Sequence, residues 1–258
     1  MIHMVEIKLK YGFKDGEYSL CHVKSYLELI MVLNGVYLTT YLQNNMSILI
    51  FFILHWYLSL SMQTIFLHRY SSHKMFKLNQ FWEKVFFLFT FIFQGSSFLN
   101  PRAYAIMHLN HHKYSDTIND PHSPKYSKNI FSFIYKTFDN YSKILNKDNY
   151  NSDFPKWDFI EKIGDLWLTR ILFSLLYILF YINYASSFWF YLLIPIHIFM
   201  GPIHGTIVNW FGHKIGYRNY KELKDSSKNT LIFDLFMMGE LYQNNHHNNS
   251  TKINFASK

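Results

Sequence analysis

The stretch SILIFFILHWYLSLSMQTIFL, residues 47–67, decides the fold of this chain. It contains no Asp, Glu, Lys or Arg. As a helix it is long enough to cross the hydrocarbon core of a bilayer, which is about 30 Å thick. We therefore expect a transmembrane helix here and an integral membrane protein overall.

The composition of the 258-residue chain also favours a membrane protein. Half of the residues are hydrophobic and only 16% are charged, whereas soluble domains carry about 25% charged residues. The formal net charge of +8 would suit a nucleic-acid partner, but the lysines lie in loops between apolar segments. A positive excess in such loops is typical of the cytoplasmic side of a membrane protein, so we expect no nucleic acid as a partner.

Two more apolar runs follow, at residues 166–184 and 187–208. Only two residues separate them, so we expect a tight helical hairpin that returns to the side on which it began. Residues 85–99 would reach only about 22 Å as a helix, which is less than a full crossing. They predict a re-entrant or interfacial helix. Residues 25–43 are moderately apolar and indicate a poor span or a surface helix.

The predicted fold is an all-α integral membrane protein with three to four transmembrane helices, the re-entrant or interfacial helix, and a cytosolic helical cap. Residues 1–45 form an N-terminal segment of uncertain structure, and residues 46–258 form one membrane domain. The cap comprises residues 100–165 and 209–258. Counting the crossings places both parts of the cap and the end of the first span on the same side of the membrane, which we expect to be cytoplasmic.

Histidine is the main candidate metal ligand. The chain has 14 histidines and a single cysteine, Cys21, which allows neither an intrachain disulfide nor a thiolate cluster. Eight of the histidines fall in four groups at the ends of apolar segments: HRYSSH (68–73), HLNHH (108–112), NWFGH (209–213) and QNNHH (243–247). Because these segments should all end on one side, the groups are expected to meet.

The spacing of the second group shows how imidazoles could converge. Residues at i, i+3 and i+4 share one helical face, so His108, His111 and His112 can point to one site. Eight imidazoles exceed the four ligands of a tetrahedral zinc and suit two metal ions. Ligand type alone does not choose among iron, copper, nickel and zinc. Any one group alone could be polar residues at a membrane edge, but four in order favour a functional site.

These groups resemble the histidine boxes of the membrane fatty acid desaturases, specifically the Δ9-type acyl desaturases. The matching stretches are HRYSSH (68–73), HLNHHKYSDTINDPHSP (108–124), NWFGHKIGYRN (209–219) and KNTLIFDLFMMGELYQNNHH (228–247). The resemblance runs from about residue 47 to the end of the sequence. It implies an oxidoreductase with two non-haem iron ions, which uses dioxygen and two electrons to introduce a cis double bond into a long saturated acyl chain.

The resemblance also implies the metal-site residues and the partners. The site residues are His68, His73, His108, His111, His112, Asn209, His213, Gln243, His246 and His247, with Asn209 reaching a metal through water. The implied partners are membrane lipid, an acyl substrate linked to CoA, carrier protein or lipid, and an electron donor such as a ferredoxin or a b-type cytochrome. Asp116 and Asp120 would either orient histidine ligands or belong to a solvated turn. Phe91, Phe93, Trp189 and Trp210 would either wall an acyl tunnel or pack in the core and against lipid.

Two departures from the family pattern keep other functions open. Gln243 stands where the Δ9 pattern often has histidine, and the sequence stops 11 residues after His247, earlier than members with a further cytosolic segment. The alternatives are a related di-iron alkyl hydroxylase and a truncated or inactive desaturase that keeps its histidines as relics.

Overall fold

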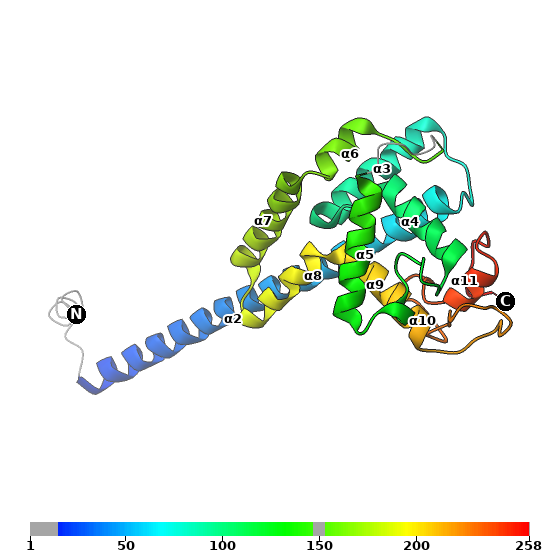
Figure 1. Cartoon of the computed structure of the whole chain (residues 1–258). Coiled ribbons are helices and arrows are strands. Elements are labelled where there is room, and N and C mark those ends of the chain that lie inside the picture. The colour runs from blue at the N-terminus through cyan, green and yellow to red at the C-terminus, as the bar shows by residue number, and fades with distance from the viewer. Residues whose placement is uncertain (1–14, 147–152, 258) are drawn as a thin grey trace.

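A computed structural model describes residues 15–146 and 153–257. Within these residues the chain is helical, and a long N-terminal helix projects from a body formed by the other helices (Figure 1). The expected all-α architecture is therefore observed. The first 14 residues of the predicted N-terminal segment and residues 147–152 of the predicted cap lie outside the described residues.

The projecting helix is α2 (Asp15–Ser61), which continues directly into the π-helical segment η1 (Met62–Ser72). The predicted span at 47–67 therefore belongs to a longer helix. Residues 25–43 are part of that same helix, so they form no element of their own. The candidate span Glu28–Ser72 has 45 residues, whereas about 20 residues cross a bilayer, so only part of it can lie in hydrocarbon.

The predicted hairpin is present, but its second arm is bent. Helix α7 (Trp167–Tyr184) accounts for the run 166–184. The run 187–208, expected as one span, is a bent pair in which Phe188–Ile198 meets Met200–Lys214 at 76°, and its crossing of the membrane stays a prediction. Among the described residues, two helices are long and apolar enough to cross a membrane, or three if the bent pair counts as one span.

Pro202 explains the bend between α8 (Ile194–Ile198) and α9 (Met200–Thr206). Proline has no N–H to donate to the carbonyl oxygen four residues earlier, which belongs to Ile198. The hydroxyl of Ser96 donates to that oxygen instead, at 2.9 Å. The bend is thus fixed by a contact from a distant part of the chain.

The segment expected to be re-entrant or interfacial forms helix α3 (Gln80–Gln94) and the short turn η2 (Gly95–Ser97). Helix α3 has 15 residues, which is too short for a full crossing. It ends at Gly95, whose φ of 50° suits glycine. Arg170 of α7 donates to the carbonyl oxygens of Ser96 and Phe98, both at 3.0 Å, and so holds the turn against α7.

The cap carries most of the candidate metal site. Its first part contains α4 (Pro101–Tyr114), α5 (Ile130–Leu145) and α6 (Asp158–Gly164), and its second part contains α10 (Gly212–Lys214) and α11 (Gln243–Asn248). Asn100 caps α4 by accepting hydrogen bonds from the backbone N–H groups of Arg102 and Ala103. Its amide nitrogen donates to Glu161 and Asp165, so the helix that carries three histidines starts at a fixed point.

Candidate metal centre

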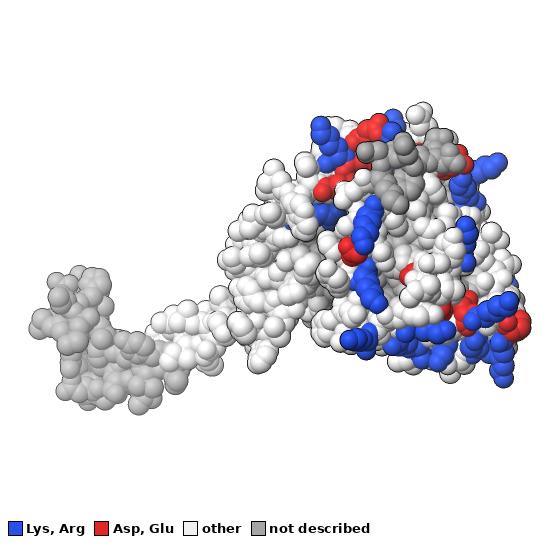
Figure 2. All heavy atoms as spheres, in the orientation of Figure 1, with Lys and Arg blue, Asp and Glu red and all other residues white. Residues whose placement is uncertain are grey.

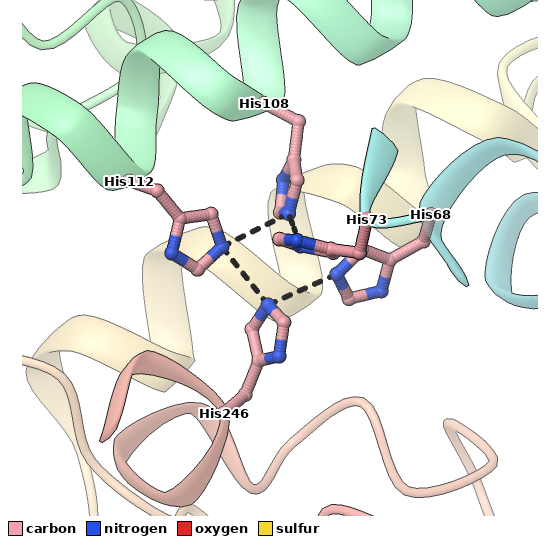
Figure 3. Close-up of side chains that lie close together, drawn as sticks. All are labelled: His68, His73, His108, His112 and His246. Atoms are coloured by element: carbon pink, nitrogen blue, oxygen red, sulfur yellow. Dashed lines mark hydrogen bonds between the residues drawn. The ribbon is translucent and has the colours of Figure 1, made fainter. Parts of the chain in front are cut away.

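Histidines from the four sequence groups converge in two adjacent sets. The first set is formed by His68, His73, His108, His112 and His246, whose ligand atoms all lie within 4.8 Å of one another. Figure 3 shows these five rings pointing toward a common centre from η1, from His73 directly after it, from α4 and from α11. The second set is formed by His111, His213 and His247, within the same limit. All eight histidines of the predicted site belong to one set or the other.

The π-helical form of η1 explains why His68 and His73 share a face. In a π-helix the backbone hydrogen bonds join residues five apart, and the N–H of His73 donates to the carbonyl oxygen of His68 at 3.1 Å. The two ring centroids are 5.0 Å apart. An i, i+5 spacing that is irregular for an α-helix therefore places both imidazoles in the first set.

Each adjacent histidine pair divides between the two sets. His112 belongs to the first set and His111 to the second, and His246 and His247 divide in the same way. Consecutive residues of an α-helix point about 100° apart, so one doublet on α4 and one on α11 can each serve two sites. His108 lies one turn before His112, with the two Nε2 atoms 3.0 Å apart.

The nitrogen atoms of the second set fit a metal ion. The Nε2 atoms of His111, His213 and His247 are buried and have no hydrogen-bond partner, although leaving a buried polar atom unpaired costs free energy. Their Nδ1 atoms are all engaged by carboxylates. Each ring therefore turns the same free nitrogen toward its neighbours, as metal-binding histidines do when a carboxylate holds the other nitrogen.

The nitrogen atoms of the first set crowd against one another. Nε2 of His73 lies 2.8 Å from that of His108, and Nε2 of His246 lies 2.9 Å from that of His112 and 3.0 Å from that of His68 (Figure 3). A neutral imidazole carries only one N–H, so these contacts place several lone pairs around one point. That arrangement also fits a metal ion.

Four acidic residues hold the Nδ1 atoms of four of these histidines. Asp116 lies 2.9 Å from His213 and Asp120 lies 2.9 Å from His111, which confirms that both predicted aspartates contact candidate ligands. Two further pairs were missed by sequence reasoning: Asp225 with His247 at 2.9 Å and Glu240 with His68 at 2.7 Å. No spacing rule singles out Asp225, but Glu240 lies only three residues before the QNNHH group.

Burial and these contacts set the charges of the site. Burial raises the pKa of Asp116, but hydrogen bonds from His213 and Ser226 outweigh burial and hold the pKa well below its usual range. Burial is the largest cause that raises the pKa of Asp120 to about 6, and it outweighs the hydrogen bonds from the backbone of Asp116 and His122. For the histidines, burial lowers the pKa of His73 to about 3 and that of His108 well below its usual value. Burial likewise lowers the pKa of His111, His112, His246 and His247, so these six rings can donate lone pairs to a metal near pH 7.

Glu240 is the most connected of the acidic residues. Its carboxylate accepts hydrogen bonds from the hydroxyl of Thr64 and from Arg69, the latter at 2.5 Å, in addition to its contact with His68. Its side chain is buried, which raises the pKa, but the interactions with His68 and Arg69 outweigh burial and lower the pKa to about 2. A negative charge is thus fixed beside the first set.

Asn209 and Gln243 line a small cavity beside the first set, together with His68 and His108. The amide nitrogen of Asn209 donates to the carbonyl oxygen of Gly205 at 2.8 Å, and that of Gln243 donates to the carbonyl oxygen of Glu240 at 2.7 Å. Both residues therefore lie where the sequence places them, next to the histidines. Their role as metal ligands stays a prediction.

His122 is a buried histidine that sequence reasoning passed over. Neither of its ring nitrogens has a hydrogen-bond partner, and its ring lies 4.4 Å from that of His111. With His111 and Asp120 it forms a third group of possible ligands. The signal in the sequence was its place in DPHSP, within the second matching stretch, but it belongs to no histidine doublet.

The aromatic residues considered for an acyl tunnel contact other rings or are exposed. Phe91 contacts Phe98 and Phe173, with ring centroids 5.8 and 5.6 Å apart. Trp210 packs against Phe133, and Trp189 is 74% exposed. Phe93 stacks on Phe89. These contacts agree with the alternative of core packing or contact with lipid, and a role in an acyl tunnel stays a prediction.

Comparison with known proteins agrees with this site. The profile of the family "Fatty acid desaturase" matches residues 45–252, a range that contains all four histidine groups. The chain therefore belongs to the fatty acid desaturase family, as its resemblance to the family predicted. Membership of this family, together with the long apolar helices, identifies a membrane protein.

Three relatives define what the chain is similar to. It is 31% identical over 190 residues to a Delta-9 desaturase-like 4 protein of Arabidopsis thaliana, a match covering 71% of this chain and 59% of the relative. It is 26% identical over 219 residues to a hex-5-enoyl-[acyl-carrier protein] acetylenase of Moorena producens, covering 74% of this chain and 63% of the relative. It is 28% identical over 193 residues to Delta-9 acyl-lipid desaturase 2 of Arabidopsis thaliana, covering 71% and 58%. The chain thus spans about three fifths of the length of these curated relatives.

Proposed function

We propose that this protein is an oxygen-dependent acyl desaturase that introduces a cis double bond, at the Δ9 position, into a long saturated acyl chain. Two iron ions would be held by the two histidine sets, with Asn209 and Gln243 completing the ligands. The observation that carries the proposal is the convergence of eight buried or half-buried histidines in two adjacent sets in a member of the fatty acid desaturase family.

The proposed reaction defines the partners. Bound iron would supply the redox chemistry. Two hydrogens removed from the acyl chain, together with two protons and two electrons, would reduce one dioxygen molecule to two water molecules. An external donor such as a ferredoxin or a b-type cytochrome must deliver the electrons. The names of two relatives specify an acyl-carrier-protein and an acyl-lipid substrate, and we propose an acyl chain on CoA, carrier protein or lipid for this protein.

The residues of the chain prepare the site for this chemistry. Burial lowers the pKa of six of the eight imidazoles, so metal binding needs no loss of protons from these six rings near pH 7. The four carboxylates on Nδ1 atoms fix the tautomers and direct Nε2 into each set. Negative charge on Glu240 and on the aspartates beside the second set would also offset the positive charge that two metal ions bring into a buried site. We propose that this face of the protein lies on the cytoplasmic side.

The test is to express the full chain with a reductase and donor in cells that lack Δ9 desaturation, and to analyse their acyl chains by mass spectrometry after derivatising the double bonds. The expected result is a new monounsaturated chain with its cis double bond at Δ9, together with about two iron ions per purified chain. The variant His213→Ala serves as the inactive control. A hydroxylated product would show that the protein is a hydroxylase and not a desaturase. Iron-loaded protein that forms no product would overturn the proposed activity.

A further inference from the structure

The loop Leu231–Phe236, LIFDLF, lies between the third and fourth histidine groups and is almost wholly apolar. Ile232 is 89% exposed, Phe233 79% and Leu235 67%. Loops on a water-facing surface usually turn polar side chains outward, and a contiguous exposed apolar patch marks an interaction surface. The composition of this loop therefore requires a partner.

The single charged residue of the loop points inward. Asp234 is buried, and its carboxylate accepts hydrogen bonds from the backbone N–H groups of Met237 at 2.8 Å and Leu241 at 2.9 Å. The loop is thus held rigidly with its charge inside and its apolar side chains outside. This polarity is the reverse of that expected for a loop in water.

The loop packs against α2, one of the helices that are long and apolar enough to cross a membrane. The ring of Phe236 packs against Trp56 of α2 with 4.8 Å between centroids, and the indole N–H of Trp56 donates to the carbonyl oxygen of Phe236. The preceding residue of α2, His55, contacts Tyr177 in the middle of α7, at 5.1 Å. Phe236 therefore lies at the level of the middle of a candidate span.

We propose that Leu231–Phe236 is a membrane-inserted loop, with Ile232, Phe233 and Leu235 contacting the acyl chains of bilayer lipids beside α2. Continuity with this candidate span identifies lipid as the partner, because a protein partner would have to compete with lipid at that level. The loop ends four residues before Glu240, so lipid contact fixes the fourth histidine group against the membrane. This inference does not depend on the reaction that the metal site performs.

Spin labelling tests the proposal, because Cys21 is the only native cysteine. In a Cys21→Ser background, Ile232→Cys, Phe233→Cys and Leu235→Cys each receive a nitroxide, and the full chain is reconstituted in phosphatidylcholine nanodiscs. Three positions are used so that the result does not rest on one variant. The matched control is Ile118→Cys, since Ile118 is an apolar residue that is 76% exposed but lies in a polar turn.

Accessibility to oxygen, which concentrates in hydrocarbon, is compared with accessibility to a water-soluble nickel chelate. The proposal predicts an oxygen-to-nickel ratio at 232, 233 and 235 that is severalfold higher than at 118. Equal ratios at all four positions would place the loop in water and overturn the proposal. Labels at 232, 233 and 235 that are shielded from both reagents would show that protein covers the loop, which would overturn it as well.

Discussion

Oε2 of Glu240 lies 2.7 Å from Nδ1 of His68, across a sequence separation of 172 residues. The same carboxylate pairs with Arg69, so one buried charge organises two consecutive residues at the end of η1. This contact links the last part of the cap to the end of the long helix, and it makes Glu240 a residue that positions a candidate metal ligand.

Replacing Glu240 by Gln should weaken iron binding without removing any ligand. Gln keeps the shape of the side chain but loses the charge that holds His68, and loss of such a contact typically lowers metal affinity by about 10- to 100-fold. Competition with a chromophoric chelator measures the change. Asp139→Asn is the control, because Asp139 pairs with Lys143 on the exposed surface. Equal affinities for Glu240→Gln and the native protein would contradict the positioning role.

Removing one histidine from the second set should lower the iron content by about half. His213→Ala leaves two of the three histidines in that set but leaves the five-histidine set intact, so we expect about one iron ion per chain rather than about two. Elemental analysis of the purified variant measures the stoichiometry. His197→Ala is a useful comparison, since His197 pairs with His55 and lies in neither set. An unchanged iron content in His213→Ala would show that the second set binds no iron.

Gly212 should not tolerate a larger residue. A Cβ at this position would lie 2.5 Å from Cγ of Gln243, so Gly212→Ala must displace the glutamine that lines the cavity. Overpacking of this kind typically costs about 1–3 kcal/mol, and a thermal-shift measurement should show a lower Tm. Gly205→Ala is the matched control, because its nearest neighbour would be Nε2 of Gln63 at 3.6 Å, an ordinary contact. A Tm for Gly212→Ala equal to that of Gly205→Ala would contradict the predicted clash.

The metal-free protein should lose stability as the pH falls below about 6.5. Burial lowers the pKa of His73 and of His122 to about 3 in the folded state, whereas an unfolded histidine has a pKa of about 6.5. Between these values the unfolded chain binds more protons, so stability decreases as the pH decreases. Each such histidine contributes about 1.4 kcal/mol per pH unit within that window.

Asp120 acts in the opposite direction, because its folded pKa of about 6 lies above the usual value of 3.8. It contributes stability that is lost as the pH rises through 6. Since several histidines oppose this one aspartate, the net loss on acidification should remain. Thermal unfolding of chelator-treated protein at pH 7.5 and pH 5.5 measures it, and a Tm that is unchanged or higher at pH 5.5 would contradict the prediction.

Sequence patterns predicted the parts of the site that depend on local geometry. The i, i+3 and i+4 spacing on α4 and the order of the four groups anticipated which histidines meet. Asp116 and Asp120 could be predicted as contacts of the histidines because they follow that helix closely in the sequence. Glu240, Asp225 and His122 were missed because their roles arise from contacts between distant segments, which no local spacing encodes.

The helices also divide into features that local sequence predicts and features that depend on distant contacts. The run at 166–184 reads directly as α7, because length and apolarity are local properties. The 76° bend at Phe199 could not be predicted from the local sequence in this way. Proline can either kink or end a helix, and here the geometry is fixed by the hydroxyl of Ser96, about a hundred residues earlier in the chain.

The separation between ligands has a consequence for how the protein acquires its metal. His68 and His246 lie 3.0 Å apart but are 178 residues apart in sequence, so the five-histidine set does not exist until the last segment of the cap has folded onto the first span. If the set holds a metal ion as we propose, metal loading would come last in biogenesis. The bound ion would then tie the two ends of the membrane domain together and stabilise only the assembled state.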